Sequence, residues 1–330
     1  MQIGIIGAGE IVRQMHLPVL LGMPGVRIAW LFDTAADRAA ALAAAYGVRA
    51  VSAPTPVDLP PCDVALIAIP LPAREPYLRV MSERGTAVFC EKPFASGAVE
   101  HTRYIEWFAP HALGVGYMRR FYRSTRVLAH LLENRWFGPL QSLRIGEGGR
   151  SRGSGSGRSF LEDRRLAAAR GVLTDLGTHT LDLVLQLVAP AGFVVRHSEL
   201  ILDGEVDRHA AASITLSRGA EPVVALDWSV SWLTEQPNTI ELRFRDVSAW
   251  CSLAPGAEVF IGDPARPARA ARLGLELDGA ISGNQAFFLE WQEFLRGVER
   301  REVSAVAAVS ALQTTALAEA IRGARRVAAA

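Results

Sequence analysis

Short, almost wholly apolar runs alternate with longer amphipathic stretches over the first third of the chain. The runs lack the polar alternation of a half-exposed strand, which is typical of parallel strands covered on both faces. Stretches with apolar positions at helical spacing lie between them, so the pattern predicts an α/β, doubly wound parallel sheet. The expected strands are Gln2–Ile6, Arg27–Phe32, Val64–Ile69, Ala87–Cys90 and Ala112–Val115, and the expected helices are Ile11–Leu21, Ala35–Tyr46, Ala73–Arg84 and Ala98–Phe108.

After Phe121 the pattern changes to strands that follow one another with short turns between them. Such runs predict a mostly antiparallel sheet with helices on one face, an α+β arrangement. We therefore expect two domains, residues 1–118 and 119–330. The expected strands of the second domain are Leu140–Glu147, Val194–Leu202, Ala210–Leu216, Val223–Ser231, Thr239–Phe244, Ala249–Leu253 and Glu258–Ile261, and the expected helices are Ser124–Asn134, Gly171–Val188, Asn284–Glu299 and Val303–Val327.

Composition narrows the class of protein. Half of the 330 residues are apolar, 21% are charged and the net charge is +1, so no broad basic field predicts a nucleic-acid or membrane partner. No apolar run is long enough to span a bilayer, because polar residues interrupt the stretch 172–188. The three cysteines have neither metal-ligand spacing nor the number for a disulfide framework. We expect a cytoplasmic protein without a metal.

The first expected strand runs directly into Gly7-Ala8-Gly9-Glu10-Ile11-Val12. Gly7 permits a tight turn, and Gly9 lets the backbone approach a pyrophosphate that sits on the helix N-terminus. A G-x-G motif alone is weak, but here it follows a strand and opens a helix, the context that the motif requires. We expect Gly7, Gly9, Glu10 and Ile11 to contact a dinucleotide, although Val12 replaces the third glycine.

Asp33 ends the second expected strand, where an acid can accept the ribose hydroxyls of the adenosine half. A carboxylate there repels a 2′-phosphate, so NAD is the preferred cofactor, and the nearby Arg38 leaves NADP open. A purely structural alternative is that Asp33 caps the helix that follows it.

Two further motifs add chemistry to this nucleotide site. Glu91-Lys92-Pro93 follows the strand Ala87–Cys90, so Lys92 lies at the carboxyl edge of the sheet, where ligands bind. Asp175 and His179 are four residues apart on an otherwise apolar helix, so they share a face and are costly to bury without a role. The structural alternatives are a solvated loop lysine and a surface pair on a helix.

Taken in order, these motifs resemble the glucose-fructose oxidoreductase/inositol dehydrogenase family, Gfo/Idh/MocA. The resemblance rests on Gly7-Ala8-Gly9, His16-Leu17-Pro18, Asp33, Glu91-Lys92-Pro93, Gly116 through Phe121, and Gly171 through His179. It implies an N-terminal Rossmann domain and a C-terminal domain with an open-faced sheet. It also implies hydride transfer between nicotinamide and a hydroxyl or ketone carbon of a sugar, cyclitol or sugar derivative.

The resemblance also implies roles for individual residues. Lys92, Asp175 and His179 are the expected catalytic and substrate-binding residues, and either Lys92 or His179 transfers the proton. Tyr117 and Arg164 are further expected substrate contacts, and the remaining expected cofactor contacts are Ile69, Pro70, Glu91 and Arg120. Glu91 is expected to face the cofactor ribose or a backbone amide. One departure is Arg74, which stands where many relatives have a histidine after a Pro-Asn signature.

The Arg-rich stretch 148–170 has two interpretations, a solvated loop or a lid in which Arg164 and Arg165 contact an anionic substrate. Two alternatives to a dehydrogenase also stay open. One is a nucleotide-sensing or scaffold protein without turnover, and the other is an imine reductase or redox-assisted lyase. We expect a homo-oligomer, a dimer or tetramer, formed through the uncovered face of the second sheet.

Overall fold

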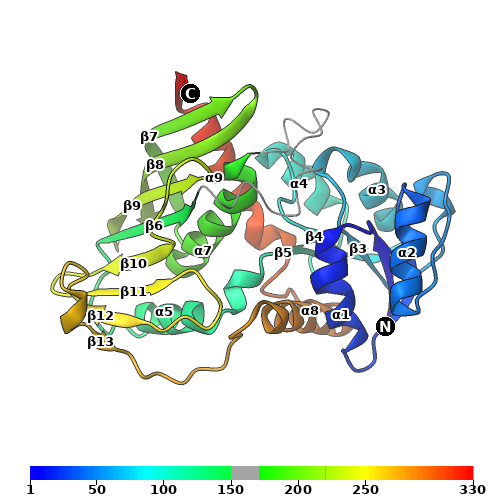
Figure 1. Cartoon of the computed structure of the whole chain (residues 1–330), viewed down its shortest axis with the longest axis horizontal. Coiled ribbons are helices and arrows are strands. Elements are labelled where there is room, and N and C mark those ends of the chain that lie inside the picture. The colour runs from blue at the N-terminus through cyan, green and yellow to red at the C-terminus, as the bar shows by residue number, and fades with distance from the viewer. Residues whose placement is uncertain (150–170, 220, 330) are drawn as a thin grey trace. The chain divides into compact units, whose positions relative to one another are not determined.

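The computed structural model describes residues 1–149, 171–219 and 221–329. Contacts divide the chain into two compact units (Figure 1). The first unit is Met1–Tyr117 with Gly283–Thr315, and the second is Met118–Ser282 with Ala316–Ala330. The chain therefore changes unit next to the expected boundary at residue 118, but it also returns: the segment Gly283–Thr315, expected in the second domain, lies in the first unit.

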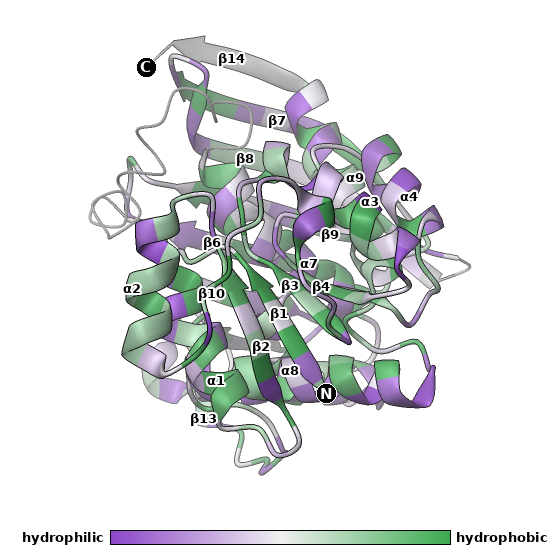
Figure 2. Cartoon of the chain, turned by 90° about the vertical axis from the view of Figure 1, so that its right-hand side faces the viewer, coloured by the Kyte–Doolittle hydropathy of each residue, from purple (hydrophilic) through white to green (hydrophobic). Residues whose placement is uncertain are grey.

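Five parallel strands form the sheet of the first unit, in the order β2-β1-β3-β4-β5. Figure 2 shows mostly apolar colour along β1, β2 and β3, as expected for strands covered on both faces. The strands are β1 Gln2–Ile6, β2 Arg27–Phe32, β3 Val64–Ile67, β4 Ala87–Glu91 and β5 Leu113–Gly116, and the α-helices are α1 Leu17–Leu21, α2 Ala36–Tyr46, α3 Glu75–Glu83, α4 Ala98–Glu106 and α8 Gly283–Arg300. The predicted doubly wound sheet is confirmed.

Helix α8 belongs to the first unit because its aromatic residues fill the interior there. Trp291 is fully buried, with its ring centroid 4.4 Å from that of Phe89 on β4. Phe294 packs on Gly114 of β5, where an added Cβ would lie 2.6 Å from the ring. Buried aromatic rings contribute large apolar areas, so this helix is part of the core of the first unit.

The second unit is built on a nine-stranded sheet, in the order β13-β12-β11-β10-β6-β9-β8-β7-β14. Neighbours are antiparallel except for β6 with β9 and β14 with β7. The strands are β6 Ser142–Gly148, β7 Gly192–Asp203, β8 Val206–Arg218, β9 Glu221–Ser231, β10 Thr239–Arg243, β11 Ser248–Ser252, β12 Phe260–Gly262, β13 Ala271–Arg272 and β14 Arg325–Ala329. The predicted mostly antiparallel sheet is confirmed.

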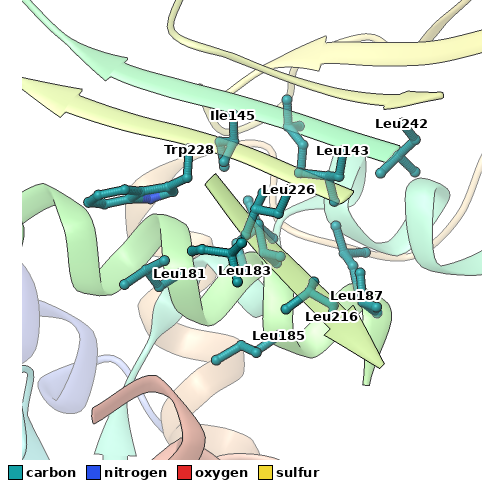
Figure 3. Packing of buried hydrophobic residues seen from close by; sticks show 14 of the residues in the cluster. Leu143, Ile145, Leu181, Leu183, Leu185, Leu187, Leu216, Leu226, Trp228 and Leu242 are labelled. Atoms are coloured by element: carbon teal, nitrogen blue, oxygen red, sulfur yellow. The ribbon is translucent and has the colours of Figure 1, made fainter. Parts of the chain in front are cut away.

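One face of this sheet is packed against helices α5 Arg123–Glu133, α7 Thr178–Val188 and α9 Leu312–Gly323. Strand β9 shows the alternation: Val224, Leu226, Trp228 and Val230 are buried, and the residues between them point to the other face. Figure 3 shows the leucines of α7 against side chains of β6, β8, β9 and β10. Trp228 is fully buried in this core, and its indole N–H donates to Thr180 Oγ1 at 2.8 Å.

The end of the chain departs from the expected single helix Val303–Val327. A 3-10 turn, Ala308–Ala311, leads into α9, which ends at Gly323, and Arg325–Ala329 then pairs with β7 as the parallel strand β14. The apolar positions of a short segment fit both the helical period and the strand period, so the pattern alone did not distinguish a helix from an edge strand. Along the described residues, no helix combines the length and apolar character that a membrane span needs.

His101 on α4 gives the first unit a pH-dependent stability. The side chain is fully buried, with Nδ1 2.7 Å from Thr315 Oγ1 and Nε2 2.9 Å from the carbonyl oxygen of Ala308. Burial lowers the pKa of His101 from 6.5 to about 4, so between these values the unfolded chain binds the extra proton. We therefore expect the contribution of His101 to the free energy of unfolding to be complete above pH 6.5 and to fall by about 3 kcal/mol between pH 6.5 and 4.

His101→Gln, which cannot titrate, should reduce the change in the free energy of unfolding between pH 6.5 and 4. Urea unfolding of the wild-type and variant proteins at pH values in this range measures the difference, because all other titrating groups are the same in both. Parallel pH profiles for the two proteins would show that His101 does not carry the effect.

Candidate active site

The expected cofactor and catalytic residues of the first unit fall in one row across its sheet. Register places Phe32, Ile6, Ile67 and Cys90 side by side on β2, β1, β3 and β4. The residues that follow them are Asp33, Gly7, Ala68 and Glu91, all at the carboxyl edge. Strand order reverses between β1 and β3, which is where doubly wound sheets bind ligands. Lys92 follows β4, two strands or about 10 Å from the glycine turn.

The glycine turn needs Gly7 and leaves space at Gly9. Gly7 has φ +111°, and a Cβ there would lie 2.4 Å from the carbonyl oxygen of Ala68, so no other residue fits. A Cβ on Gly9 would meet no atom within 4 Å, which is the open approach that a pyrophosphate requires. Val12 is fully buried at the third glycine position and begins a π-helical turn, Val12–His16, ahead of α1. The expected helix Ile11–Leu21 is confirmed as one continuous helical stretch that contains this π-helical turn.

Asp33 is tied to the glycine turn. Its Oδ2 accepts the backbone N–H of Ala8 and its Oδ1 accepts that of Ala35, both at 2.8 Å. The Nη1 atom of Arg38 lies 3.7 Å from Oδ2, and the Arg38 side chain is 61% exposed. The N-cap residue of α2 is Ala35 and no side chain caps this helix, so Asp33 orders the turn before α2 and does not cap it. Asp33 also fixes an anion beside the dinucleotide turn.

Glu91 lies in a buried network with His16 and Trp291. The indole N–H of Trp291 donates to His16 Nδ1 at 2.9 Å, so His16 carries its proton on Nε2 and donates it to Glu91 Oε1 at 2.7 Å. Oε2 of Glu91 accepts the backbone N–H of Lys92 at 3.1 Å. Burial raises the pKa of Glu91, but the His16 hydrogen bond and the charges of Lys92 and Arg74 outweigh it and hold the pKa below its usual value.

Lys92 is half-buried, and it is the only lysine among the 35 Lys and Arg residues of the chain. Arginine stays protonated at any physiological pH, whereas a lysine amine can give up and regain a proton. A chain that uses arginine everywhere else keeps lysine at the carboxyl edge of the sheet. This count in the sequence is a signal for Lys92 that is independent of the Glu-Lys-Pro motif.

Asp175 and His179 lie in the second unit, on successive turns of one helical segment. Asp175 is exposed on a π-helical turn, Leu173–Gly177, and His179 is half-buried in the first turn of α7. A buried carboxylate fixes the start of this segment: Asp207 Oδ2 accepts the N–H of Leu173 at 2.7 Å. Burial raises the pKa of Asp207 despite that bond and the nearby charge of Arg322.

Gly171 is required at this helix start. It has φ +118°, and a Cβ on it would lie 2.1 Å from Asp207 Oδ1. The sequence marked Gly171 as part of the motif but did not point to Asp207, which is distant along the chain.

Two buried arginines follow β5, and each has a carboxylate partner. Arg119 donates from both terminal nitrogens to Glu147, at 2.7 and 2.9 Å. The charges of Glu147 and Asp175 raise the pKa of Arg119 against the opposing effect of burial, so Asp175 lies within electrostatic range of this pair. Arg120 donates from Nε to Asp182 of α7 at 2.8 Å and from Nη2 at 2.5 Å.

The remaining residues that were expected to contact cofactor or substrate lie in different surroundings. The cofactor role expected of Arg120 stays a prediction, and the structure adds Asp182 as its partner. Tyr117 is 2% exposed in the core of the first unit, and its substrate role also stays a prediction. Glu10 and Ile11 are at the solvent surface, where Glu10 pairs with Arg13. Arg164 and Arg165, with most of the Arg-rich stretch, lie outside the described residues.

The first unit fits a nicotinamide dinucleotide: its turn has room for a pyrophosphate at Gly9, and it offers the Asp33 carboxylate to a ribose. In the parts of the chain that the structure describes, no group of three or more His, Cys, Asp or Glu side chains is arranged to hold a metal ion.

Known proteins are similar to the chain in two ways. Residues 1–112 match the family model described as an oxidoreductase family with an NAD-binding Rossmann fold. Inositol 2-dehydrogenase 3 of Saccharopolyspora erythraea is 31% identical over 138 residues, which is 40% of each chain. The inositol 2-dehydrogenase of Leifsonia xyli is 31% identical over 149 residues, 44% of each chain. The matched segments thus span less than half the length of these relatives.

Solved structures match over the whole chain. A 3-ketoreductase from Actinomadura kijaniata superposes with a TM-score of 0.81 at 16% identity, covering 100% of this chain and 99% of that one. An aldose-aldose oxidoreductase from Caulobacter crescentus gives a TM-score of 0.80 at 17% identity, covering 98% and 97%. These likenesses show that the fold of both units is shared. Residues 1–112 are therefore similar to the NAD-binding Rossmann domain of the Gfo/Idh/MocA family of oxidoreductases.

Proposed function

We propose that the chain transfers a hydride between a nicotinamide cofactor and a hydroxyl or ketone carbon of a sugar, cyclitol or sugar derivative. The observation that carries this proposal is the single lysine, Lys92, held at the carboxyl edge of the sheet two strands from the glycine turn. The chain's own second-unit residues Asp175 and His179 complete the set of proton-handling groups, and their meeting with Lys92 over the reacting carbon is part of the proposal.

Lys92 acts as the general base when an alcohol is oxidised. Its neutral amine takes the proton of the reacting hydroxyl while the hydrogen on the same carbon leaves as hydride and the carbon becomes a carbonyl. NAD(P), when bound, accepts that hydride. In the reverse direction the Lys92 ammonium returns the proton to the oxygen. His179 and Asp175 hydrogen-bond the reacting hydroxyl and fix its orientation, which supplies rate by positioning.

The substrate class follows from similarity and from the polar residues at the site. The curated relatives are named as inositol dehydrogenases. Solved neighbours include the 3-ketoreductase with NADP and TDP-benzene, and the aldose-aldose oxidoreductase with glycerol. Cyclitols, aldoses and nucleotide-linked ketosugars are thus the panel to try with NAD(H) and NADP(H), and nicotinamide absorbance reports turnover. No turnover on the whole panel would favour the sensor alternative.

The cofactor preference we propose is NAD, because the Asp33 carboxylate is fixed beside the adenosine ribose position. Wild-type protein is expected to bind NADH more tightly than NADPH in a fluorescence titration. Asp33→Ser should reduce that preference by about tenfold, since it removes repulsion of a 2′-phosphate and frees Arg38 to pair with it. Asp37→Ser, which removes an exposed charge from the first turn of α2, is the matched control. Tighter NADPH binding by the wild type would show that Asp33 is misread.

Self-association through the open face of the second sheet is the other part of the proposal. This face carries a cavity of about 400 Å³ lined from β6, β7, β8, β9 and β10, with Arg144, Asp227 and Glu241 among its residues. Val194 on β7 and Val223 on β9 are half exposed or more. A face with apolar and charged residues in alternation suits a second protein surface. Light scattering of the wild-type protein measures the stoichiometry.

A further inference from the structure

Arg74 is a buried cation that joins two loops at the carboxyl edge of the first sheet. It is 4% exposed, and it precedes α3 at the position where many relatives carry a histidine. Its Nε donates to the carbonyl oxygen of Ile69 at 2.8 Å, in the loop after β3. Its Nη1 donates to the carbonyl oxygen of Glu91 at 2.7 Å and also to that of Pro93, after β4.

The carbonyl groups of Glu91 and Pro93 flank Lys92 on both sides. The backbone N–H of Lys92 is held as well, by the Glu91 carboxylate, which His16 holds in turn. The polar backbone groups around Lys92 are thus fixed by a cation on one side and an anion on the other. Hydrogen bonds from a charged donor are stronger than those between neutral groups, so they can order a short turn.

The guanidinium fork is what allows one residue to reach both loops. Its nitrogens lie in a rigid plane, so Nε can donate to the carbonyl oxygen of Ile69 while Nη1 donates to carbonyl oxygens of the turn after β4. A lysine at the same position offers one nitrogen and cannot span the two loops with the same geometry. Arg74 thus joins the expected cofactor loop, Ile69–Pro70, to the catalytic turn, by which we mean Glu91-Lys92-Pro93 after β4.

We infer that Arg74 is a positioning residue, which sets the place of the Lys92 amine relative to the cofactor loop Ile69–Pro70. This inference rests on the proposed function, since it assigns Arg74 a part in the same reaction. Misplacement of a reacting group by about 1 Å lowers rates by about 100-fold, so loss of the fork should act on the chemical step.

The test compares Arg74→Lys with a matched control, Arg84→Lys. Arg84 at the other end of α3 also donates to two backbone carbonyls, those of Leu59 at 2.8 Å and Val57 at 2.5 Å, but away from the catalytic turn. Arg74→Lys should lower kcat by about 10- to 100-fold with KM and the Kd of NADH changed less than about threefold. Arg84→Lys should leave all three within about twofold.

A second readout does not need turnover. Because Lys92 is the only lysine, an amine-specific reagent modifies one side chain, and the α-amino group serves as an internal reference. Arg74→Gln, which removes the charge and leaves Lys92 the only lysine, should change the labelling rate of Lys92 relative to the α-amino group by about fivefold or more. Amide exchange in residues 88–97 should become faster in both Arg74→Gln and Arg74→Lys.

The outcomes separate the two proposals. If wild-type protein turns over none of the panel while Lys92 labelling still responds to Arg74→Gln, the proposed function fails and the contact role of Arg74 survives. If kcat falls only in proportion to the folded fraction, with Lys92 labelling and amide exchange unchanged, Arg74 is a structural residue and the inference is overturned. A fall in kcat with altered labelling supports it.

Discussion

Lys92→Arg is expected to lower turnover by about 10³-fold or more while NADH binding stays within about twofold of wild type. The substitution keeps the positive charge and a similar length, so a role limited to charge or hydrogen bonding would survive it. A role in proton transfer would not, because a guanidinium does not release its proton near neutral pH. Stopped-flow turnover and a fluorescence titration of NADH measure the two quantities on the same samples.

The control for this prediction removes the positive charge of Lys92 instead of keeping it. Lys92→Ala removes both charge and amine, and added small alkylamines should restore part of its rate, whereas Lys92→Arg should not respond to them. Turnover of Lys92→Arg within tenfold of wild type would remove Lys92 from proton transfer and leave His179 as the remaining candidate for that step.

Arg120→Met is expected to lower the free energy of unfolding of the second unit by about 3–5 kcal/mol, because it leaves the Asp182 carboxylate buried without its ionic partner. The Arg120 and Asp182 side chains are only 5% and 3% exposed. Replacing both, in Arg120→Met/Asp182→Leu, should recover much of the loss. Urea unfolding monitored by tryptophan fluorescence measures all three proteins.

A surface pair provides the comparison for Arg120. Arg144 lies 3.1 Å from Asp227, and both side chains are more than 60% exposed, so Arg144→Met should change stability by less than about 1 kcal/mol. The same samples decide the role of Arg120 toward the cofactor. An NADH Kd that rises at least tenfold in Arg120→Met, with stability unchanged, would contradict the structural role and favour direct cofactor contact.

The sequence predicted the first sheet well because its signals are local. Each strand there is an apolar run, and the glycine turn, Asp33 and Glu91-Lys92-Pro93 each follow one, so their order along the chain already places them at one edge. The parallel register then brings Asp33, Gly7 and Glu91 into one row. The alternation of apolar and polar residues along β8 and β9 likewise allowed the antiparallel sheet to be predicted.

Partners across the fold were not predictable in the same way. Arg120 and Asp182 are 62 residues apart, and His16 and Trp291 are 275 apart, so nothing local in the pattern assigns one to the other. The sequence marks His16 only as part of the His16-Leu17-Pro18 motif, and the structure adds its hydrogen bonds to Glu91 and Trp291. Helix α8 was recognised as a helix, but its place in the first unit depends on aromatic packing that hydropathy periodicity does not encode.

The transfer of label from the cofactor tests the central claim most directly. Enzyme is incubated with NADH or NADPH carrying deuterium at nicotinamide C4, on either face, together with ketones of the cyclitol, aldose and nucleotide-sugar classes, and the products are analysed by mass spectrometry and NMR. Hydride transfer predicts one deuterium on the carbon that bore the carbonyl, from one face only, and its loss with Lys92→Arg. Reduced product without cofactor deuterium, or no reduced product from any class, would contradict it.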